Sequence, residues 1–572
     1  MPIYERFIGK HRDDFKSMDD IRENIRFIYD DDFNFAYDVI DVLAKEKPDK
    51  RALVWLGDDG REKIFTFADV ARESDRAANY FTSLGIKKGD SVLLVLRRHY
   101  LFWFCIMGLH KIGAITVQAT DMLMAKDYIY RCNKAEIKAV VITDHGDCTK
   151  YYDEGADECV TVQHKLVVGH KDAGEGWRDF EAEFEATSAD GWVRPTGENA
   201  IKSTDIMLYS FSSGTTSYPK MVAHDFRYPL GHIMTGVFWH RVVDGGLHFT
   251  VSDTGWLKSL WGKMYGQWFG ESAIMVYDFD KFNGADILAV IEKYKVTTFC
   301  VPPTMYRFIL QNDVTKYDLS SIVHCCTAGE ALNPEIFNTW KENTGLEIYE
   351  GFGQTETTVA IGTFYPYMKP MLGAIGVSAP HIDVHIVDLD GDDCPVGQVG
   401  EICVKTEYET RPVGICHSYN RSREDTEGVY YGGFFHTGDT AYKDERGYIH
   451  YVGRNDDIIK SSGYRIGPFE IESVLIEHPA VLEVAVTGVP DPVRGFNVKA
   501  TIVLQKGYEG SPELVKELQN YVKKNTAPYK YPRVVEFVDS LPKTASGKIR
   551  RTAIRQRDME KYLEEQQKQN NG

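Results

Sequence analysis

Long apolar runs are missing from this sequence of 572 residues. The densest one, residues 100–109, stops at His110 and Lys111, so it is too short to cross a bilayer and predicts a buried helix. The amino terminus mixes acidic and basic residues without a continuous apolar core, which favours neither a signal peptide nor a transit peptide. The polar carboxyl terminus carries no targeting address that we recognise. We therefore expect a cytoplasmic protein without a membrane span.

Closely spaced cysteine pairs and an excess of positive charge are also lacking. The ten cysteines include no C-x-x-C pair, the nearest two being Cys325 and Cys326, which excludes the usual zinc spacing and a small-protein disulfide framework. They are expected to be reduced and mostly buried thiols. The formal net charge of −18 argues against nonspecific binding of nucleic acid or anionic membranes. A polyanionic ligand therefore requires a locally basic or amide-rich pocket.

What is present is the texture of a large globular α/β protein. The length exceeds what one core organises, and 43% hydrophobic with 26% charged residues is an ordinary globular balance. A helical period runs from Phe67 to Phe81, with Thr66 and Asp69 as a cap pair and Gly85 as a stop. A strand-like run at 92–96, an apolar helix around Trp103 and a strand at 140–143 follow, and a second alternating region spans 273–326. This alternation predicts a layered α/β fold.

The pattern of predicted strands and helices changes after Gly447. A strand at 449–452 and a charged break at 454–457 precede a small α+β unit, whose helix begins at Pro468 and whose strands are predicted at 484–489, 500–504 and 534–538. We place a domain boundary at Asp456, which divides the chain into residues 1–455 and 456–572. The polar residues 564–571 are predicted to be a frayed tail.

The first chemical motif is an apolar strand that runs into a hydroxyl-rich loop, residues 209–220, with the order Ser-Gly-Thr-Thr followed by Pro-Lys. Such a loop offers backbone N–H groups, hydroxyl donors and the cation of Lys220 to a polyphosphate. The spacing is not that of a Walker A loop. Taken alone, a Ser/Thr-rich surface loop is the alternative interpretation.

The second motif, residues 349–357, is Tyr-Glu-Gly-Phe-Gly-Gln-Thr-Glu-Thr. Gly351 and Gly353 let backbone approach a ligand, Thr355 can donate to a phosphate, and Glu356 can hold magnesium on phosphate oxygens. A glycine-rich turn before an ordinary helix would explain the glycines but not the Gln-Thr-Glu.

Two further motifs follow in the last third of the chain. His436-Thr437-Gly438-Asp439 precedes residues 453–457 and 463–465, and a carboxylate in a Gly-Asp turn suits ribose hydroxyls while arginines suit sugar and phosphate. Residues 541–551 are locally basic and present a Gly-Lys pair that could reach a developing charge. Each piece alone is more often a turn, a surface ion pair or a solvated charged face.

Taken together, in this order and at these separations, the four motifs resemble the adenylate-forming superfamily of acyl-CoA synthetases, adenylation domains and luciferases. The resemblance extends from about Phe65 to Arg551, and the run 252–256 is most similar to medium-chain acyl-CoA synthetases. It implies a large N-terminal adenylation domain of several α/β subdomains and a small mobile α+β C-terminal domain. The implied activity is that of an acid–thiol ligase, which uses ATP and Mg²⁺ to form an acyl-adenylate and then transfers the acyl group to coenzyme A.

The resemblance also implies roles for individual residues. The nucleotide-binding set is Ser212, Ser213, Gly214, Thr215, Thr216 and Lys220 for the phosphates, Gly329, Glu330, Ala331, Glu350, Gly351 and Phe352 for the adenine, and Asp439, Arg454 and Arg465 for ribose and phosphate. Thr355, Glu356 and Lys548 are the implied catalytic residues, with Glu356 as the magnesium ligand. Ser217 stands where the family usually has glycine, a departure that could stiffen the loop.

The family rotates its small domain between two half-reactions, which gives Asp456 the hinge position and Gly463 the coenzyme A channel. For Asp456 a helix cap is the alternative.

The sequence does not identify the carboxylic acid substrate. Acetate-specific relatives have a tryptophan where this chain has Gly353, so we expect room for a longer or branched acid, with Trp256 lining the acyl pocket or packing as plain core. Medium-chain, branched short-chain and simple aromatic acids all remain candidates. The rival functions are an adenylation enzyme that loads a carrier protein and a non-catalytic nucleotide-binding protein. The expected partners are small molecules, with no nucleic acid, and the chain could form a homo-oligomer.

Overall fold

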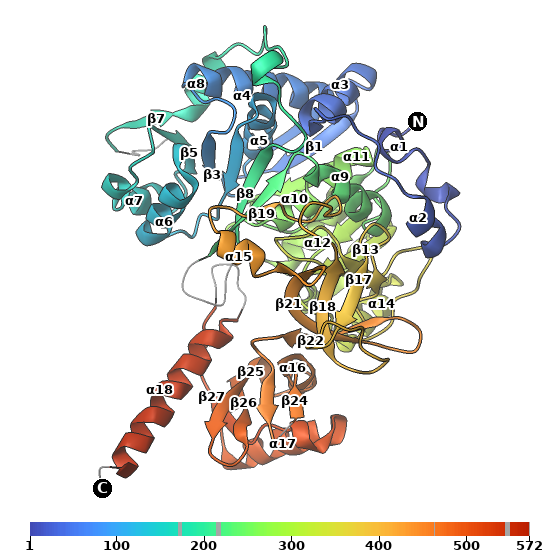
Figure 1. Ribbon diagram of the computed structural model, residues 1–572, viewed down its shortest axis with the longest axis vertical. Helices are drawn as coiled ribbons and strands as arrows, with labels where there is room; N and C mark the ends of the chain where they lie inside the picture. Colours follow the sequence, from blue (N-terminus) through green and yellow to red (C-terminus); the bar gives the residue numbers. More distant parts are fainter. Residues whose placement is uncertain (170–173, 213–218, 463, 544–548, 571–572) are drawn as a thin grey trace. The chain divides into compact units, whose positions relative to one another are not determined.

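The computed structural model describes residues 1–169, 174–212, 219–462, 464–543 and 549–570 (Figure 1). These residues group by their contacts into two compact units. Unit 1 contains residues 1–383 and 406–433, and unit 2 contains residues 384–405 and 434–572. The predicted domain boundary and the predicted hinge at Asp456 stay predictions.

The first sheet of unit 1 is mostly parallel, with antiparallel strands at both edges. Its core strands β1, β11, β10, β12, β13 and β14 pair in parallel, whereas β2, β15 and β16 are antiparallel additions. In sheet order the strands are β16 (Val377–Ser378), β15 (Ile361–Gly362), β14 (Ile348–Phe352), β13 (His324–Ala328), β12 (Thr298–Cys300), β10 (Leu247–Thr250), β11 (Ala273–Tyr277), β1 (Arg51–Leu56) and β2 (Glu62–Thr66).

The second sheet of unit 1 has the same character. Strands β8, β4, β3, β5, β6 and β7 are parallel, and β9 and β19 extend the sheet in antiparallel pairing. In sheet order the strands are β19 (Ser418–Tyr419), β9 (Lys220–Asp225), β8 (Ile206–Ser212), β4 (Ile115–Gln118), β3 (Ser91–Val95), β5 (Ile137–Thr143), β6 (His164–Val168) and β7 (Trp177–Asp179).

Helices alternate with these strands as the sequence predicts. Helix α4 (Phe67–Ser83) starts with a capping box in which the Thr66 hydroxyl accepts from Asp69 N and the Asp69 carboxylate accepts from Thr66 N. Helix α5 (Leu101–Ile112) is buried along its whole length. A Cβ added at Gly108 would lie 2.5 Å from Ala77 Cβ, so this glycine allows the two helices to pack closely. Further helices of unit 1 include α6 (Ala125–Ala135), α8 (Phe180–Ala186), α9 (Tyr228–Ile233), α11 (Tyr265–Phe269), α12 (Gly284–Tyr294), α13 (Pro303–Leu310) and α14 (Pro334–Thr344).

Unit 2 combines two sheets. One joins β17 (Val384–Val387), β18 (Gly400–Lys405), β21 (Phe434–Lys443) and β22 (Ile449–Arg454) in antiparallel pairing. The other orders β24 (Tyr464–Ile466), β23 (Ile459–Ser461), β26 (Gly495–Leu504) and β25 (Val481–Asp491), with β27 (Val534–Phe537) beside β26. Helices α16 (Pro468–Ile476) and α17 (Pro512–Asn525) contribute to its apolar core. These elements confirm the predicted α+β texture after residue 447.

One expectation for the end of the chain is wrong. Residues 551–570 form helix α18 (Arg551–Asn570) instead of a frayed tail from residue 564. Ile554 is buried on this helix, and the buried Asp558 carboxylate pairs with Lys499 Nζ at 2.7 Å. A hydrophobic anchor and an internal ion pair one turn apart fix the first half of the helix, and the polar half continues from it.

The fold class is confirmed, because both units mix helices with sheets as expected for this architecture. Among the described residues, no helix combines the length and the apolar character needed to cross a membrane.

Candidate active site

Two of the predicted nucleotide segments emerge at the same edge of the first sheet. Strands β13 and β14 are parallel neighbours, and Ala328 lies opposite Gly351. Residues 329–331 therefore leave β13 beside residues 351–353, at the end of β14. Gly329 has φ +102°, a conformation that favours glycine. Ligands of open α/β sheets bind outside the carboxyl ends of the strands, which makes this edge a candidate binding site.

Glu350 is a buried carboxyl at this edge. The residue is 6% exposed, and Oε1 accepts a hydrogen bond from Leu332 N at 3.0 Å. Burial raises the pKa of Glu350 to about 8, although the Leu332 N–H lowers it in part. The carboxyl ties the segment after Gly329 to β14. On the same segment, Glu330 Oε2 accepts from Thr304 Oγ1 at 2.6 Å.

Glu356 is held by residues from elsewhere in unit 1. The residue is 8% exposed, and Oε1 accepts a hydrogen bond from Tyr419 OH at 2.8 Å. Its backbone oxygen accepts from Cys416 N at 2.7 Å. The preceding carbonyl, Thr355 O, accepts from His224 Nε2 at 2.8 Å. The Gln-Thr-Glu motif is thus attached to β9 and to the segment that carries β19.

Lys220 also contacts Tyr419. It opens β9 opposite Ser212, the last residue of β8. Its Nζ lies 4.9 Å from the centroid of the Tyr419 ring and 2.9 Å from Asp425 Oδ1. Tyr419 therefore contacts both the lysine of the first motif and the glutamate of the second, and the structure brings these two predicted residues together.

Tyr419 was missed by sequence reasoning. It lies in none of the four motifs, and its place beside Glu356 follows from the pairing of β19 with β9, in which Tyr419 lies opposite Val222. No local signal in residues 416–420 indicates this contact.

Several predicted residues lie outside the described part of the chain. They are Ser213, Gly214, Thr215 and Thr216 with the departure at Ser217, the channel residue Gly463, and Lys548. The side chain of Arg465 is likewise not described. Their roles stay predictions.

The predicted ribose residues form a compact group in unit 2. Asp439 on β21 lies opposite Arg454 on β22 and is 4% exposed. Asp439 Oδ1 accepts from Tyr451 OH at 3.0 Å and lies 4.0 Å from Arg454 Nε. Arg454 Nε also lies 3.5 Å from Asp456 Oδ1. Burial and the neighbouring Asp439 carboxylate raise the pKa of Tyr451, so the phenol stays a hydrogen-bond donor.

Trp256 lies in a tight turn of unit 1. Trp256 N donates to Asp253 O at 3.2 Å, and Gly255 N donates to Asp253 Oδ1 at 2.8 Å. A Cβ at position 255 would lie 2.2 Å from Thr120 N, so glycine is needed there. The Trp256 side chain is half-buried, an environment that fits either a pocket lining or plain packing.

The backbone of Gly353 lies directly against a tryptophan side chain. A Cβ built on Gly353 would lie 2.1 Å from Trp261 Cη2 and 2.5 Å from Thr358 O. Glycine is therefore needed at this position, and whether it leaves room for a longer or branched acid stays a prediction. Trp261 is 6% exposed and lies in helix α10 (Lys258–Gly262), and nothing in the sequence near it indicates this contact.

Aromatic contacts link this tryptophan to two buried imidazoles, directly to His232 and through the Tyr228 ring to His224. The rings of His232 and Trp261 are 6.0 Å apart, and those of His224 and Tyr228 are 3.9 Å apart. Burial lowers the pKa of His224 to about 4, so its ring is neutral at pH 7. Since His224 Nε2 faces a carbonyl oxygen it carries the proton, which leaves Nδ1 as an acceptor. That buried Nδ1 has no hydrogen-bond partner among the described residues.

The chain was compared with protein-family models, and two of them match it. The AMP-binding enzyme model matches residues 40–411, and the AMP-binding enzyme C-terminal domain model matches residues 470–548. The chain belongs to the AMP-binding enzyme family. The first match covers the phosphate, adenine and Gln-Thr-Glu motifs, and the second ends at Lys548.

Named relatives agree with the family assignment. The chain is 37% identical over 565 residues to the mitochondrial acyl-coenzyme A synthetase ACSM3 of Rattus norvegicus, covering 97% of this chain and 96% of that protein. It is 39% identical over 536 residues to the mitochondrial acyl-coenzyme A synthetase ACSM5 of Homo sapiens, covering 92% and 90%. These comparisons confirm the prediction of an AMP-forming acyl-CoA synthetase, an acid–thiol ligase of a family that uses ATP and coenzyme A.

Solved structures lead to the same family. The anthranilate CoA ligase AuaEII, in complex with anthranoyl-AMP, matches with a TM-score of 0.82 at 28% identity over 92% of this chain and 97% of that one. A benzoate CoA ligase from Burkholderia xenovorans LB400 matches with a TM-score of 0.77 at 25% identity over 91% and 100%.

The same relatives correct one expectation. The names of ACSM3 and ACSM5 place those proteins in mitochondria, so the expectation of a cytoplasmic protein is wrong.

Proposed function

We propose that this acyl-CoA synthetase activates a compact aromatic acid, with ATP as the second substrate and Mg²⁺ as the metal. In the first half-reaction a carboxylate oxygen of the acid attacks the α-phosphorus of ATP, and pyrophosphate leaves with the bridging oxygen. In the second, the sulfur of coenzyme A attacks the acyl carbon, AMP leaves, and the thiol proton passes to solvent. Each thioester formed thus consumes one ATP.

The residues around Glu356 fit a magnesium ion. Hard cations take oxygen ligands, and the Glu356 carboxylate is an oxygen donor oriented by Tyr419 OH at 2.8 Å. Bound there, the metal would neutralise charge that develops on the phosphate oxygens. Lys220 would add a cation to the phosphates once it exchanges Asp425 for them. The Asp439 carboxylate is proposed to accept hydrogen bonds from the ribose hydroxyls, and Arg454 to donate to oxygens of the nucleotide, as in the family.

The choice of acid rests on one observation, the Trp261 indole against Gly353. If Gly353 lines the acyl pocket, as the family resemblance implies, Trp261 closes the direction in which a straight chain would extend. An aromatic ring is flat and short, and it can pack against the indole and the neighbouring imidazoles. Among medium-chain, branched and aromatic acids, the position of the Trp261 indole favours an aromatic acid as the substrate. The likeness to benzoate and anthranilate CoA ligases agrees with this choice.

The test is thioester formation across a panel of straight, branched and aromatic acids of matched carbon number, with ATP, Mg²⁺ and coenzyme A. We expect kcat/KM for benzoate or a substituted benzoate to exceed that for the straight-chain acid of equal size by about 10-fold or more. A straight medium-chain acid as the best substrate would refute the aromatic proposal. Adenylate formation without thioester would instead favour an enzyme that loads a carrier protein.

Trp261→Leu refines the test. Removing the indole should raise the relative kcat/KM for longer straight-chain acids by about 10-fold, since one methylene in an apolar pocket is worth about 1–3 kcal/mol. Trp192→Leu makes the same change at a half-buried tryptophan bonded to Tyr37 OH, away from Gly353, and should leave the preference unchanged. An equal shift in both variants would show that Trp261 does not shape the pocket.

A further inference from the structure

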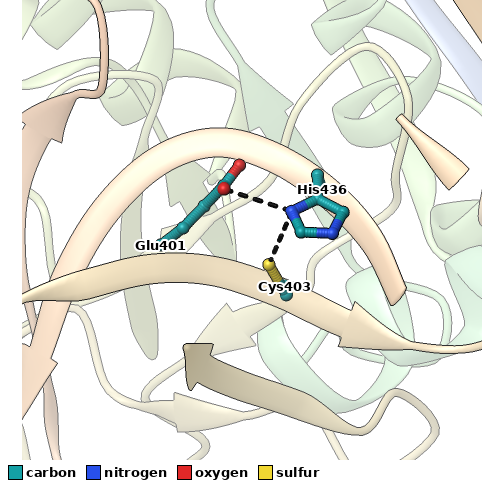
Figure 2. A group of neighbouring side chains, drawn as sticks. All are labelled: Glu401, Cys403 and His436. Atoms are coloured by element: carbon teal, nitrogen blue, oxygen red, sulfur yellow. Dashed lines mark hydrogen bonds and ion pairs between the residues drawn. The ribbon is translucent and has the colours of Figure 1, made fainter. Parts of the chain in front are cut away.

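Three side chains of different chemistry converge between two neighbouring strands of unit 2. Glu401 and Cys403 lie two residues apart on β18, so both project from the same face of the sheet. His436 lies on β21, directly opposite Cys403 in the strand register. Figure 2 shows the three side chains pointing toward one another. The adenylation chemistry described above uses none of them.

The donor atoms are spaced like the ligands of one metal ion. His436 Nδ1 lies 3.1 Å from Glu401 Oε2 and 3.3 Å from Cys403 Sγ, and a set of one ligand atom from each residue lies within 4.8 Å. Zinc bonds of about 2.0–2.3 Å at tetrahedral angles place two ligand atoms about 3.4–3.6 Å apart. The two distances to His436 Nδ1 are close to these values, and the Glu401 and Cys403 ligand atoms lie within 4.8 Å of each other. Rotation of the Glu401 and Cys403 side chains toward a shared ion would complete a three-ligand site, with a water molecule in the fourth position.

Hydrogen bonds among the three side chains explain their arrangement less well than a bound metal ion does. Nδ1 of one imidazole carries at most one proton, so it cannot donate to the carboxylate and the thiol at the same time. A cation at the centre would satisfy a lone pair on each of the three atoms. Glu401 can bind it through Oε2, because Oε1 is engaged by Gly438 N at 2.8 Å.

The charges and the burial favour a zinc-like ion over a hard cation. A carboxylate, a thiolate and a neutral imidazole carry two negative charges, which one divalent ion balances. Sulfur and imidazole ligands select zinc over magnesium or calcium. Cys403 is fully buried and the side chains of His436 and Glu401 are 11% and 18% exposed, so water competes weakly.

We propose that Glu401, Cys403 and His436 form a binding site for Zn²⁺, separate from the magnesium proposed at Glu356. On binding, the Cys403 thiol releases its proton to solvent, and the neutral His436 ring carries its proton on Nε2 so that Nδ1 can bind the metal. The ion would cross-link β18 and β21 beside the turn at Gly438 that precedes Asp439. Occupancy is therefore expected to stiffen the strand that carries a predicted ribose residue.

The first experiment uses the wild-type full chain, freed of metal with a chelator and kept in excess Mg²⁺. Equilibrium dialysis with Zn²⁺ is expected to give one zinc per chain at micromolar concentration. Co²⁺ in its place is expected to give the intense near-ultraviolet thiolate-to-cobalt band together with the visible bands of a tetrahedral ion. Absence of bound zinc, or a cobalt spectrum without the thiolate band, would overturn the proposal without any variant.

Variants then assign the ligands. Cys403→Ala and Glu401→Gln should each weaken zinc binding by more than about 100-fold, since loss of an outer-shell partner alone costs about 10–100-fold. Glutamine keeps an oxygen for Gly438 N, so Glu401→Gln tests the ligand without removing that contact. Cys394→Ala removes another thiol of unit 2 and should bind zinc like the wild type. Equal affinity in Cys403→Ala and the wild type would contradict the site.

Discussion

At the scale of single residues, Tyr419 connects the two phosphate motifs. Its hydroxyl bonds Glu356 and its ring faces Lys220, so it orients both groups before any ligand arrives. A hydrogen bond to a charged group contributes about 1.5–3 kcal/mol, and the loss of about 1.4 kcal/mol from transition-state stabilisation slows a reaction about 10-fold.

Tyr419→Phe should therefore slow adenylate formation by about 10-fold, because Glu356 loses its donor while the ring beside Lys220 is kept. Pyrophosphate exchange measures this step directly. Tyr431→Phe removes the hydroxyl of an exposed tyrosine nearby in the chain and should leave the rate unchanged. Wild-type exchange in Tyr419→Phe would mean that the hydroxyl does not orient Glu356.

Glu350 makes stability depend on pH. Its pKa is 4.5 in the unfolded chain and about 8 in the folded protein, so the folded state binds more protons between these values. The free energy of unfolding therefore falls as the pH rises from 4.5 through 8, and the loss is complete above 8. Each unit of pKa difference corresponds to about 1.4 kcal/mol.

Glu350→Gln should remove this dependence, because glutamine stays neutral and still accepts from Leu332 N. We expect its melting temperature relative to the wild type to be about 3–5 °C higher at pH 9 than at pH 5. Differential scanning calorimetry across this pH range is the measurement. A constant difference between the two proteins would show that Glu350 is ionised throughout.

At the scale of elements, short sequence patterns correctly predicted helix boundaries and strands, because these depend on neighbouring residues in the chain. The Thr66 and Asp69 cap, the apolar face after Phe67 and the proline at 468 mark real helix boundaries in α4 and α16. The parallel strands of both sheets follow from buried apolar runs that alternate with helices.

Contacts between distant segments could not be predicted in this way. Tyr419 reaches Glu356 only because β19 pairs with β9, and Trp261 reaches Gly353 because α10 packs against the segment after β14. Both depend on which elements become neighbours, and no pattern in one window of sequence contains that information. The frayed tail was expected because residues 564–571 are polar, yet the Asp558–Lys499 pair holds the preceding turns of α18.

The cap of α4 offers a test at this scale. Thr66→Ala removes the side-chain acceptor for Asp69 N and should destabilise unit 1 by about 1 kcal/mol. The matched control is Thr82→Ala, at an exposed position of the same helix, which should be neutral or slightly stabilising. Thermal melts of the two variants against the wild type decide, and equal melting temperatures would contradict the capping role.

At the scale of the whole molecule, an AMP-forming acyl-CoA synthetase catalyses two half-reactions with different needs. Adenylation brings negative groups together and needs a cation where charge develops, whereas thioester formation does not need it there. The family alternates between the two by moving its C-terminal domain, and we predict that this chain does so about Asp456.

Lys548→Ala should therefore abolish pyrophosphate exchange and still convert a supplied acyl-adenylate to thioester. Both half-reactions are followed by chromatography of the nucleotide and thioester products. Lys543→Ala, a lysine of the same basic segment paired with Glu483, serves as the control and should retain both half-reactions. Loss of both half-reactions in Lys548→Ala would contradict the prediction that Lys548 serves adenylation alone.

The stoichiometry of AMP and acyl-CoA released by the wild-type protein with ATP, Mg²⁺, coenzyme A and an aromatic acid decides whether the chain is an AMP-forming acyl-CoA synthetase. We expect one AMP and one acyl-CoA for each ATP consumed, and neither product when the acid is omitted. ADP in place of AMP, or AMP without acyl-CoA for every acid tested, would rule out this activity.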